Sequence, residues 1–159
     1  IDFNARTNRG VTPLMLACIT GNKDVVQLLL DHSDPNIELN ARTNNGSTAF
    51  MLACRNGHKD VVKLLLEHLD KTIELNARTN NGSTAFMLAC INGHKYIVQL
   101  LLNHSDKNIE LNAINNSDGM TAFMLACHNL HTQICCQSER IELNALYFWR
   151  HRCCPIAPE

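Results

Sequence analysis

Apolar residues along this chain fall into short segments that recur in the same order. In residues 49–55 the apolar side chains of Phe50, Ala53 and Cys54 are spaced to share one face of a helix. The string Val-Val-Lys-Leu-Leu-Leu at 61–66 is too apolar for a helix with one face in solvent. The pattern predicts a first helix of about two turns, followed by a second helix packed between neighbours on both sides.

The residues between these segments are typical of helix ends and tight turns. Thr48 stands where a helix N-cap is expected, and in the first unit Pro13 follows Thr12, as proline does at the first position of a helix. Gly57 supplies the left-handed conformation that ends the first helix. The sequence Asn-Asn-Gly at 44–46 favours a tight turn with positive φ. Each unit therefore consists of a hairpin-like turn followed by two short helices.

This unit recurs with a fixed period. The pair Asn-Ala begins at Asn4, Asn40, Asn76 and Asn112, each 36 residues after the last, and again at Asn144 after 32 residues. Residues 40–75 and 76–111 differ at only seven aligned positions. Helices this short are marginal alone, so each unit needs its neighbours to bury its apolar faces. The period therefore predicts an all-α repeat solenoid of about four units.

The repeated residues resemble the ankyrin repeat family. The resemblance rests on Gly-Val-Thr-Pro-Leu at 10–14, on the Gly-His pairs at 57–58 and 93–94, and on the Val-Val-x-Leu-Leu-Leu and Asn-Ala strings, in register over residues 4–131. The family's fold implies stacked helix-turn-helix units joined by hairpin-like turns. It also implies that His58 and His94 hydrogen bond to the neighbouring turn. Partner proteins would bind the concave side, which the turns and first helices line.

Two features depart from the family's pattern. The histidine of its first helix is replaced by Met15, Met51, Met87 and Met124, which removes a hydrogen bond between threonine and histidine, and its proline becomes Ala49, Ala85 and Ala122. The unit is also longer than the usual ~33 residues. The additional length lies in the linkers 32–39, 68–75 and 104–111, which we expect to bulge from one edge.

We expect one repeat domain over residues 1–143, followed by an irregular tail at 144–159 that has no repeat pattern. The repeats are 4–39, 40–75, 76–111 and a degenerate fourth, 112–143, in which Leu130 replaces the helix-ending glycine and the second helix is truncated. Residues 1–3 align with the junction 37–39, so we expect a further repeat before them.

The eight cysteines divide into two groups by position. One group, Cys18, Cys54, Cys90 and Cys127, occupies the same apolar slot of the first helix, which predicts core packing as free thiols in a reducing, intracellular compartment, the cytoplasm or the nucleus. The other group could supply zinc ligands together with nearby histidines, but adjacent cysteines rarely both reach one tetrahedral ion. These residues are Cys135, Cys136, Cys153 and Cys154, with His128, His131 and His151. We therefore predict no metal site and no cofactor.

Several function classes lack their sequence signals. No nucleophile, base and orienting group recur at converging spacings, and there is no phosphate-binding loop, so we do not expect an enzyme. Aromatic residues make up 5% and the formal net charge is −1, which does not suit nucleic-acid binding. Apolar runs are far shorter than the ~20 residues that span a bilayer, so we expect no membrane contact. We predict a monomer that binds a protein partner of unknown identity.

The charged residues are unevenly distributed within the repeat. The turn and first helix, residues 4–22, 40–57 and 76–93, contain five arginines and no acidic residue. This predicts a basic concave groove and a partner with an acidic surface. The predicted binding residues are Arg6, Asn8, Arg9, Arg42, Asn44, Asn45, Ser47, Arg55, Asn56, Arg78, Asn80, Asn81, Ser83, Ile91 and Asn92.

Three alternatives to this interpretation remain open. The arginines could serve solubility alone. The chain could be a structural spacer in a larger multidomain protein. It could also be a regulatory subunit associated with an enzyme, which the sequence does not separate from a binding module.

Overall fold

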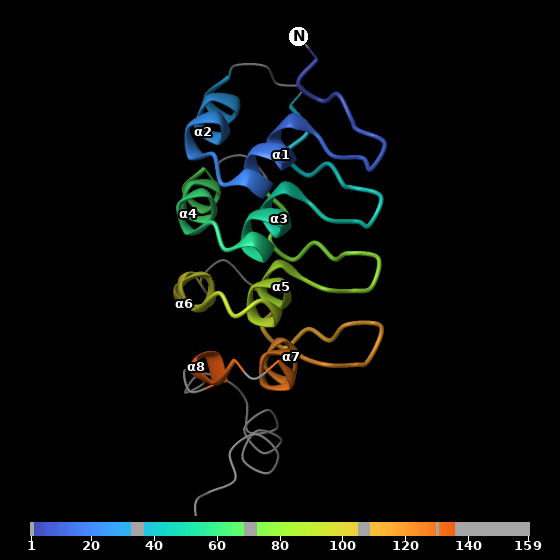
Figure 1. Cartoon of the computed structure of the whole chain (residues 1–159), viewed down its shortest axis with the longest axis vertical. Helices are drawn as coiled ribbons and strands as arrows, with labels where there is room; N and C mark the ends of the chain where they lie inside the picture. Colours follow the sequence, from blue (N-terminus) through green and yellow to red (C-terminus); the bar gives the residue numbers. More distant parts are fainter. Residues whose placement is uncertain (1, 33–36, 69–72, 105–108, 130, 136–159) are drawn as a thin grey trace, which may run out of the picture.

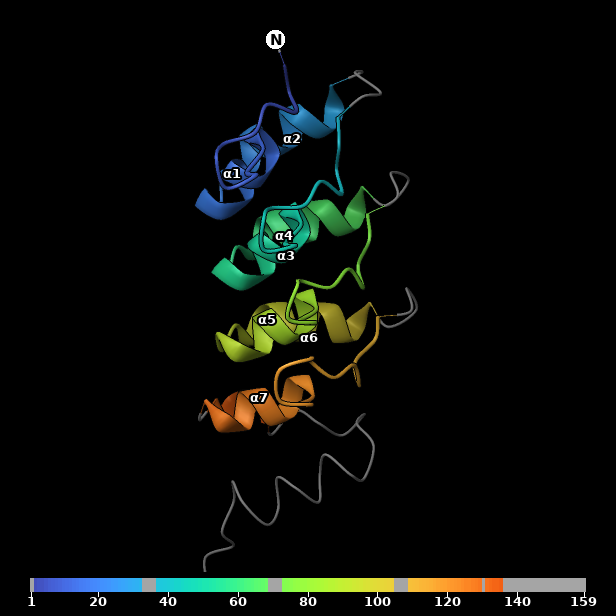
Figure 2. The ribbon, with the colours of Figure 1, turned by 90° about the vertical axis from the view of Figure 1, so that its right-hand side faces the viewer.

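The molecule is a stack of helix pairs, with hairpin turns along one side (Figures 1 and 2). The computed structural model describes residues 2–32, 37–68, 73–104, 109–129 and 131–135. The inner helices, nearer the turns, are α1 (Pro13–Thr20), α3 (Ala49–Asn56), α5 (Ala85–Ile91) and α7 (Ala122–His128). The outer helices are α2 (Lys23–Asp31), α4 (Lys59–Glu67), α6 (Lys95–Asn103) and α8 (Thr132–Cys135). The predicted all-α repeat architecture is confirmed.

Some expectations concern residues outside this described part. The middle of each linker expected to bulge, residues 33–36, 69–72 and 105–108, lies outside it. So do Leu130 and the predicted tail at 144–159. The second helix of the fourth repeat, α8, is described over 4 residues and reaches the end of the described part of the chain at Cys135, so its predicted truncation stays a prediction.

Each inner helix begins at a threonine cap. The Thr48 hydroxyl oxygen accepts a hydrogen bond from the Met51 amide at 3.4 Å, and the Thr48 amide donates to the Met51 sulfur at 3.5 Å. Thr12 and Met15 form the same reciprocal pair in the first repeat. In these two repeats the methionine that replaces the family's histidine therefore takes part in a capping box, in which its thioether accepts the N–H of the cap residue.

A glycine closes the inner helix and faces a histidine of the next repeat. Gly57 has φ 82°, in the left-handed region. A Cβ at this position would lie 2.7 Å from the His94 ring. The His94 Nε2 atom is 2.8 Å from the carbonyl oxygen of Arg55, and His58 is 2.8 Å from that of Ile19. The structural role predicted for His58 and His94 is confirmed.

Asparagines before alanine join the outer linkers to the turns. The Asn40 side-chain oxygen accepts a hydrogen bond from the Glu74 amide at 3.0 Å, and Asn76 accepts one from Glu110 at 2.9 Å. These bonds fix the segment that returns from the outer helix to the next turn. The return path places each of these glutamates directly beside a turn.

The core runs through the whole stack, between successive inner helices and beneath the outer ones. Phe50, Phe86, Val62 and Leu66 are each at most 2% exposed. Each helix pair packs against the next. Leu28 of α2 is 69% exposed, whereas the aligned residue of α4, Leu64, is 5% exposed because α4 packs against α2 of the preceding repeat.

The cysteines of the inner helices occupy this core. Cys18, Cys54, Cys90 and Cys127 are buried, and none of the four is in a disulfide. Their predicted packing role is confirmed. Burial raises the pKa of the Cys18 thiol to about 12. Burial, and then the neighbouring Cys18, raise the pKa of Cys54 further, so both thiols stay protonated at neutral pH.

No helix among the described residues is long and apolar enough to cross a membrane.

Candidate functional site

The arginines of the hairpin turns are bound within the stack. Each pairs with a glutamate that lies before the next turn, and each also donates to a backbone carbonyl of that turn. The ion pairs are Arg6 with Glu38, Arg42 with Glu74 at 3.1 Å, and Arg78 with Glu110 at 2.9 Å. The carbonyl acceptors are those of Arg42 at 3.2 Å, Arg78 at 2.7 Å and Ile114 at 3.0 Å.

The prediction that these three arginines lie on a side without carboxylates is therefore wrong. The carboxylates are distant in the sequence, but the linker brings each glutamate back beneath the turn of the preceding repeat. Arg42 and Glu74 are 44% and 54% exposed at their side chains, so solvent weakens each pair without removing it. Most of the expected positive charge along the turns is neutralised locally.

Two predicted binding asparagines also join neighbouring turns. The Asn44 side-chain amide donates to the Asn8 carbonyl at 3.1 Å, and that of Asn80 donates to the Asn44 carbonyl at 2.9 Å. The Asn44 backbone amide donates to the Arg9 carbonyl at 3.1 Å. These bonds hold the hairpins at a constant spacing along the stack.

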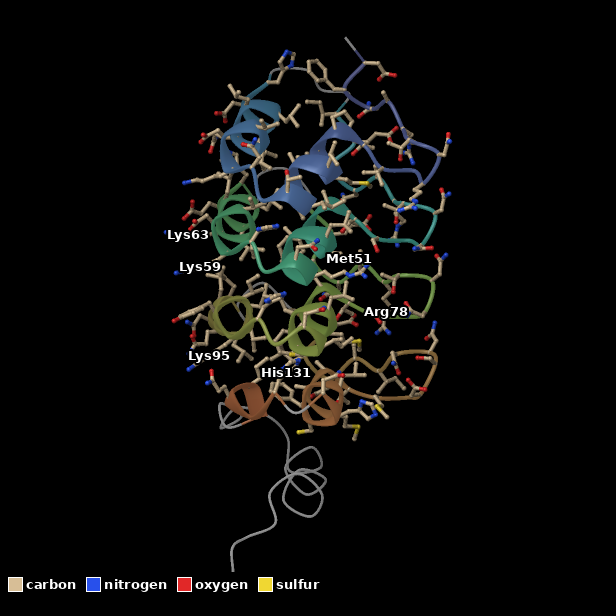
Figure 3. The ribbon with its side chains drawn as sticks, viewed as in Figure 1. Met51, Lys59, Lys63, Arg78, Lys95 and His131 are labelled. Atoms are coloured by element: carbon tan, nitrogen blue, oxygen red, sulfur yellow. The ribbon has the colours of Figure 1, made fainter. Side chains whose placement is uncertain are left out.

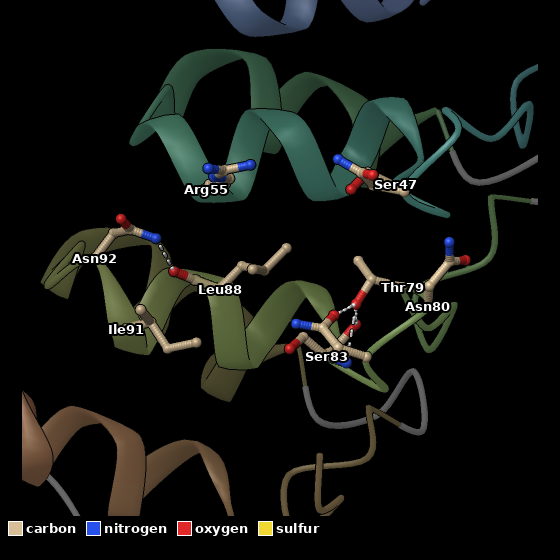
Figure 4. Close-up of a pocket in the computed structure, with 10 residues that line it drawn as sticks. Ser47, Arg55, Thr79, Asn80, Ser83, Leu88, Ile91 and Asn92 are labelled. Atoms are coloured by element: carbon tan, nitrogen blue, oxygen red, sulfur yellow. Dashed lines mark hydrogen bonds between the residues drawn. The ribbon is translucent and has the colours of Figure 1, made fainter. Parts of the chain in front are cut away.

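Other predicted residues surround a hollow between the second and third repeats (Figure 4). It has a volume of about 480 Å³ and lies between α3 and α5, beside the two hairpin turns. Eight of its lining residues belong to the predicted set: Asn45, Ser47, Arg55, Asn80, Asn81, Ser83, Ile91 and Asn92. The remaining predicted residues, which do not line this hollow, are Arg6, Asn8, Arg9, Arg42, Asn44, Asn56 and Arg78.

Arg55 differs from the arginines of the turns. It lies in the last turn of α3, where a cation is favoured by the helix dipole, and it is exposed. Within the described part of the chain its guanidinium group forms no ion pair. The aligned positions in the first and third repeats are Ile19 and Ile91. The hollow therefore holds a positive charge that neither neighbouring repeat provides at this position.

Two serine hydroxyls in the hollow are nearly enclosed. Ser47 is 6% exposed and Ser83 is 3% exposed. Their backbone amides donate to the Thr43 and Thr79 hydroxyl oxygens at 3.1 and 3.0 Å. Among the described residues neither serine hydroxyl has a hydrogen-bond partner. These hydroxyls are available to a group that enters the hollow.

A family model for ankyrin repeats (3 copies) matches residues 1–79 and 69–137. The chain belongs to the ankyrin repeat family. None of the curated proteins compared matches the sequence significantly. Ankyrin repeats are generally protein–protein interaction modules and are typically non-catalytic.

Two residues that line the hollow were not predicted from the sequence. Leu88 and Thr79 both line it, and Leu88 is half-buried on α5. Leu88 precedes the predicted Ile91 by three residues and so shares its helix face, which is a signal that could have found it. An apolar residue in a short apolar helix is more readily interpreted as core.

The outer helices of the ankyrin stack have a different surface. Figure 3 shows Lys59, Lys63 and Lys95 on the side away from Arg78. Lys63 pairs with Glu67 at 3.7 Å within α4, and the Lys59 ammonium lies 5.4 Å from the centre of the Tyr96 ring. The positive charges of Lys59 and Lys63 therefore have close partners on the same surface.

No group of three or more metal-binding side chains comes together among the described residues. His131, one of the histidines considered for zinc, has its Nε2 atom 2.8 Å from the Ile91 carbonyl oxygen. Cys136, Cys153, Cys154 and His151 lie outside the described residues, so the prediction of no zinc site there stays a prediction.

Proposed function

We propose that this ankyrin domain binds a partner protein through its groove face, the surface formed by the hairpin turns and by the sides of α3 and α5 that line the hollow. The observation that carries the proposal is the hollow itself. It combines an arginine that forms no ion pair within the described residues, two enclosed hydroxyls and the apolar side chains of Leu88 and Ile91. A polar and apolar lining of this kind suits recognition of protein segments.

The partner presents acidic side chains to this face. Arg55 supports this proposal, and Arg9 adds a second exposed arginine that forms no ion pair within the described residues. Charges at the rim of an interface act mainly on association rate and specificity. The three turn arginines contribute less positive charge to this face than their number suggests, because a glutamate neutralises each of Arg6, Arg42 and Arg78.

Site-specific photocrosslinking tests the proposal. A photoreactive amino acid at Asn92, in the hollow, is compared with the same amino acid at Lys63, on the outer surface. Both positions are exposed. In extracts of the source cells we expect discrete crosslinked species from position 92 that weaken as salt is raised.

The same pattern of crosslinks at both positions would contradict recognition by the groove face. It would favour the structural spacer, which has no preferred surface. Crosslinks only from position 63 would place the partner on the outer helices. If the protein crosslinked at position 92 is an enzyme, the result would support the alternative that this chain is a regulatory subunit.

A further inference from the structure

We propose that the hollow between α3 and α5 receives one acidic side chain, with an apolar side chain two residues away, from an extended segment of the partner. This inference rests on the proposed function and makes the partner's chemistry specific. The segment is Asp or Glu, then any residue, then an apolar residue, or the same pattern in reverse order.

The carboxylate follows from the charge of the hollow. Arg55 is the cation in its lining, and no carboxylate of the described residues pairs with it. Acidic side chains are absent from the lining itself. Guanidinium groups bind carboxylates through two parallel hydrogen bonds, which favours an acidic residue over a neutral amide.

The extended backbone follows from the serine hydroxyls. Ser47 and Ser83 occupy equivalent positions in two successive repeats and lie on opposite sides of the hollow (Figure 4). Each is more than nine-tenths buried, with a hydroxyl that lacks a partner among the described residues. An extended chain carries donors and acceptors along its length that can reach both hydroxyls, whereas a helix has already used its own.

The spacing follows from the positions of the charged and apolar groups. Arg55 comes from α3, and Leu88 and Ile91 come from α5 across the hollow (Figure 4). In an extended chain residues i and i+2 point to the same side. A carboxylate that meets Arg55 therefore places the side chain two residues away toward Leu88 and Ile91, where an apolar group is favoured.

The size of the hollow favours side chains over a folded surface. A volume of about 480 Å³ is within the range of small-molecule pockets, which hold a few side chains at most. The aligned position in the third repeat is Ile91, so the next junction does not repeat the arginine. The acidic residue therefore docks at one place along the stack and fixes the register of the segment.

Selection from a random heptapeptide phage library tests this inference. The targets are the wild-type chain and the variants Arg55→Ile and Leu88→Ser, with Lys63→Gln as a control on the outer surface. Isoleucine and glutamine are the residues of the aligned third repeat, so both changes are compatible with the fold. Circular dichroism establishes that every target is folded.

With the wild type and Lys63→Gln we expect enrichment of Asp or Glu two positions from an apolar residue. The acidic preference should disappear with Arg55→Ile, and the apolar preference should weaken with Leu88→Ser. For a selected peptide, replacing Glu by Gln should raise the dissociation constant about tenfold or more in isothermal titration.

The outcomes separate this inference from the proposed function. Peptides that depend on Leu88 but show no acidic preference would overturn the inference and leave groove-face binding intact. An acidic preference that persists in Arg55→Ile would also overturn it. If no peptide is enriched above a target-free control, the inference fails, and photocrosslinking at position 92 still decides the proposed function.

Discussion

Arg42 and Arg55 lie in the same repeat and have opposite surroundings. Arg42 pairs with Glu74 and donates to the Arg78 carbonyl, so it joins two repeats. Arg55 faces the hollow and forms no ion pair within the described residues. The position of Arg42 is arginine in three successive repeats, whereas the position of Arg55 is isoleucine in the repeats on either side.

The difference follows from the symmetry of a stack. A residue that recurs at a fixed period meets the same neighbours at every junction, so its partner recurs as well. A residue that breaks the period has no such matched partner. In this chain the recurring arginines of the turns therefore connect repeats, and the arginine that interrupts the recurrence is available to a partner.

The largest effect on stability is expected at recurring residues of the core, the buried cysteines. Cys18 and Cys54 have pKa values raised above 9.0, so the unfolded thiols ionise first as the pH rises. Their contribution to stability is complete below pH 9 and is lost progressively toward pH 12. Each thiol should lower the free energy of unfolding by about 1.4 kcal/mol per pH unit in this range. Urea denaturation between pH 8 and pH 11 measures this loss.

The double variant Cys18→Ala/Cys54→Ala is the control for this prediction. It should show a weaker dependence on pH above 9 than the wild type, because the other titrating groups are unchanged. An equal slope in the two proteins would mean that these thiols are not enclosed in the core.

A smaller loss of stability is expected when the charge of the recurring arginine is reversed. Arg42→Glu removes the bond to the Arg78 carbonyl and places a second carboxylate beside Glu74. The free energy of unfolding should fall by about 1–2 kcal/mol, reduced by the exposure of both groups. Chemical denaturation measures the change.

Two variants sharpen this measurement. Lys63→Glu reverses a charge in an exposed pair within α4 and should cost less than about 0.5 kcal/mol. The exchange Arg42→Glu/Glu74→Arg should recover part of the loss. If Arg42→Glu is no more destabilising than Lys63→Glu, the arginines of the turns serve solubility and do not connect the repeats.

The smallest effect on stability is expected at the arginine that interrupts the pattern. Arg55→Ile should change the free energy of unfolding by less than about 0.5 kcal/mol, because the side chain is exposed and isoleucine occupies the aligned positions. Thermal and chemical denaturation should agree. A loss comparable to that of Arg42→Glu would show that Arg55 has a structural partner and would remove the contrast.

The fold could be predicted because its determinants are local and repeated. Thr48, Gly57 and the 36-residue period each indicate a helix boundary or a junction without knowledge of the tertiary structure. The lining of the hollow was also largely predicted, since turns and first helices of adjacent repeats must lie side by side. Leu88 was missed because an apolar residue in an apolar helix indicates core packing, and the sequence does not show which face of the helix borders the hollow.

The environment of the turn arginines could not be predicted in the same way. Arg42 and Glu74 are separated by a complete pair of helices, and their contact depends on the path of the returning linker. The Asn40 bond to the Glu74 amide helps to fix that path. Arg42 and Glu74 belong to different segments of the repeat in the sequence, and the three-dimensional structure brings them together.

The walls of the hollow belong to two different repeats. Arg55 and Ser47 come from one, and Ser83, Leu88 and Ile91 come from the next. The width of the hollow therefore depends on the tilt between these two repeats, and a rigid occupant that is too wide or too narrow must change this tilt in order to bind. Bending the stack and filling the hollow are mechanically coupled, so the bending stiffness of the stack contributes to the affinity for any segment that binds there.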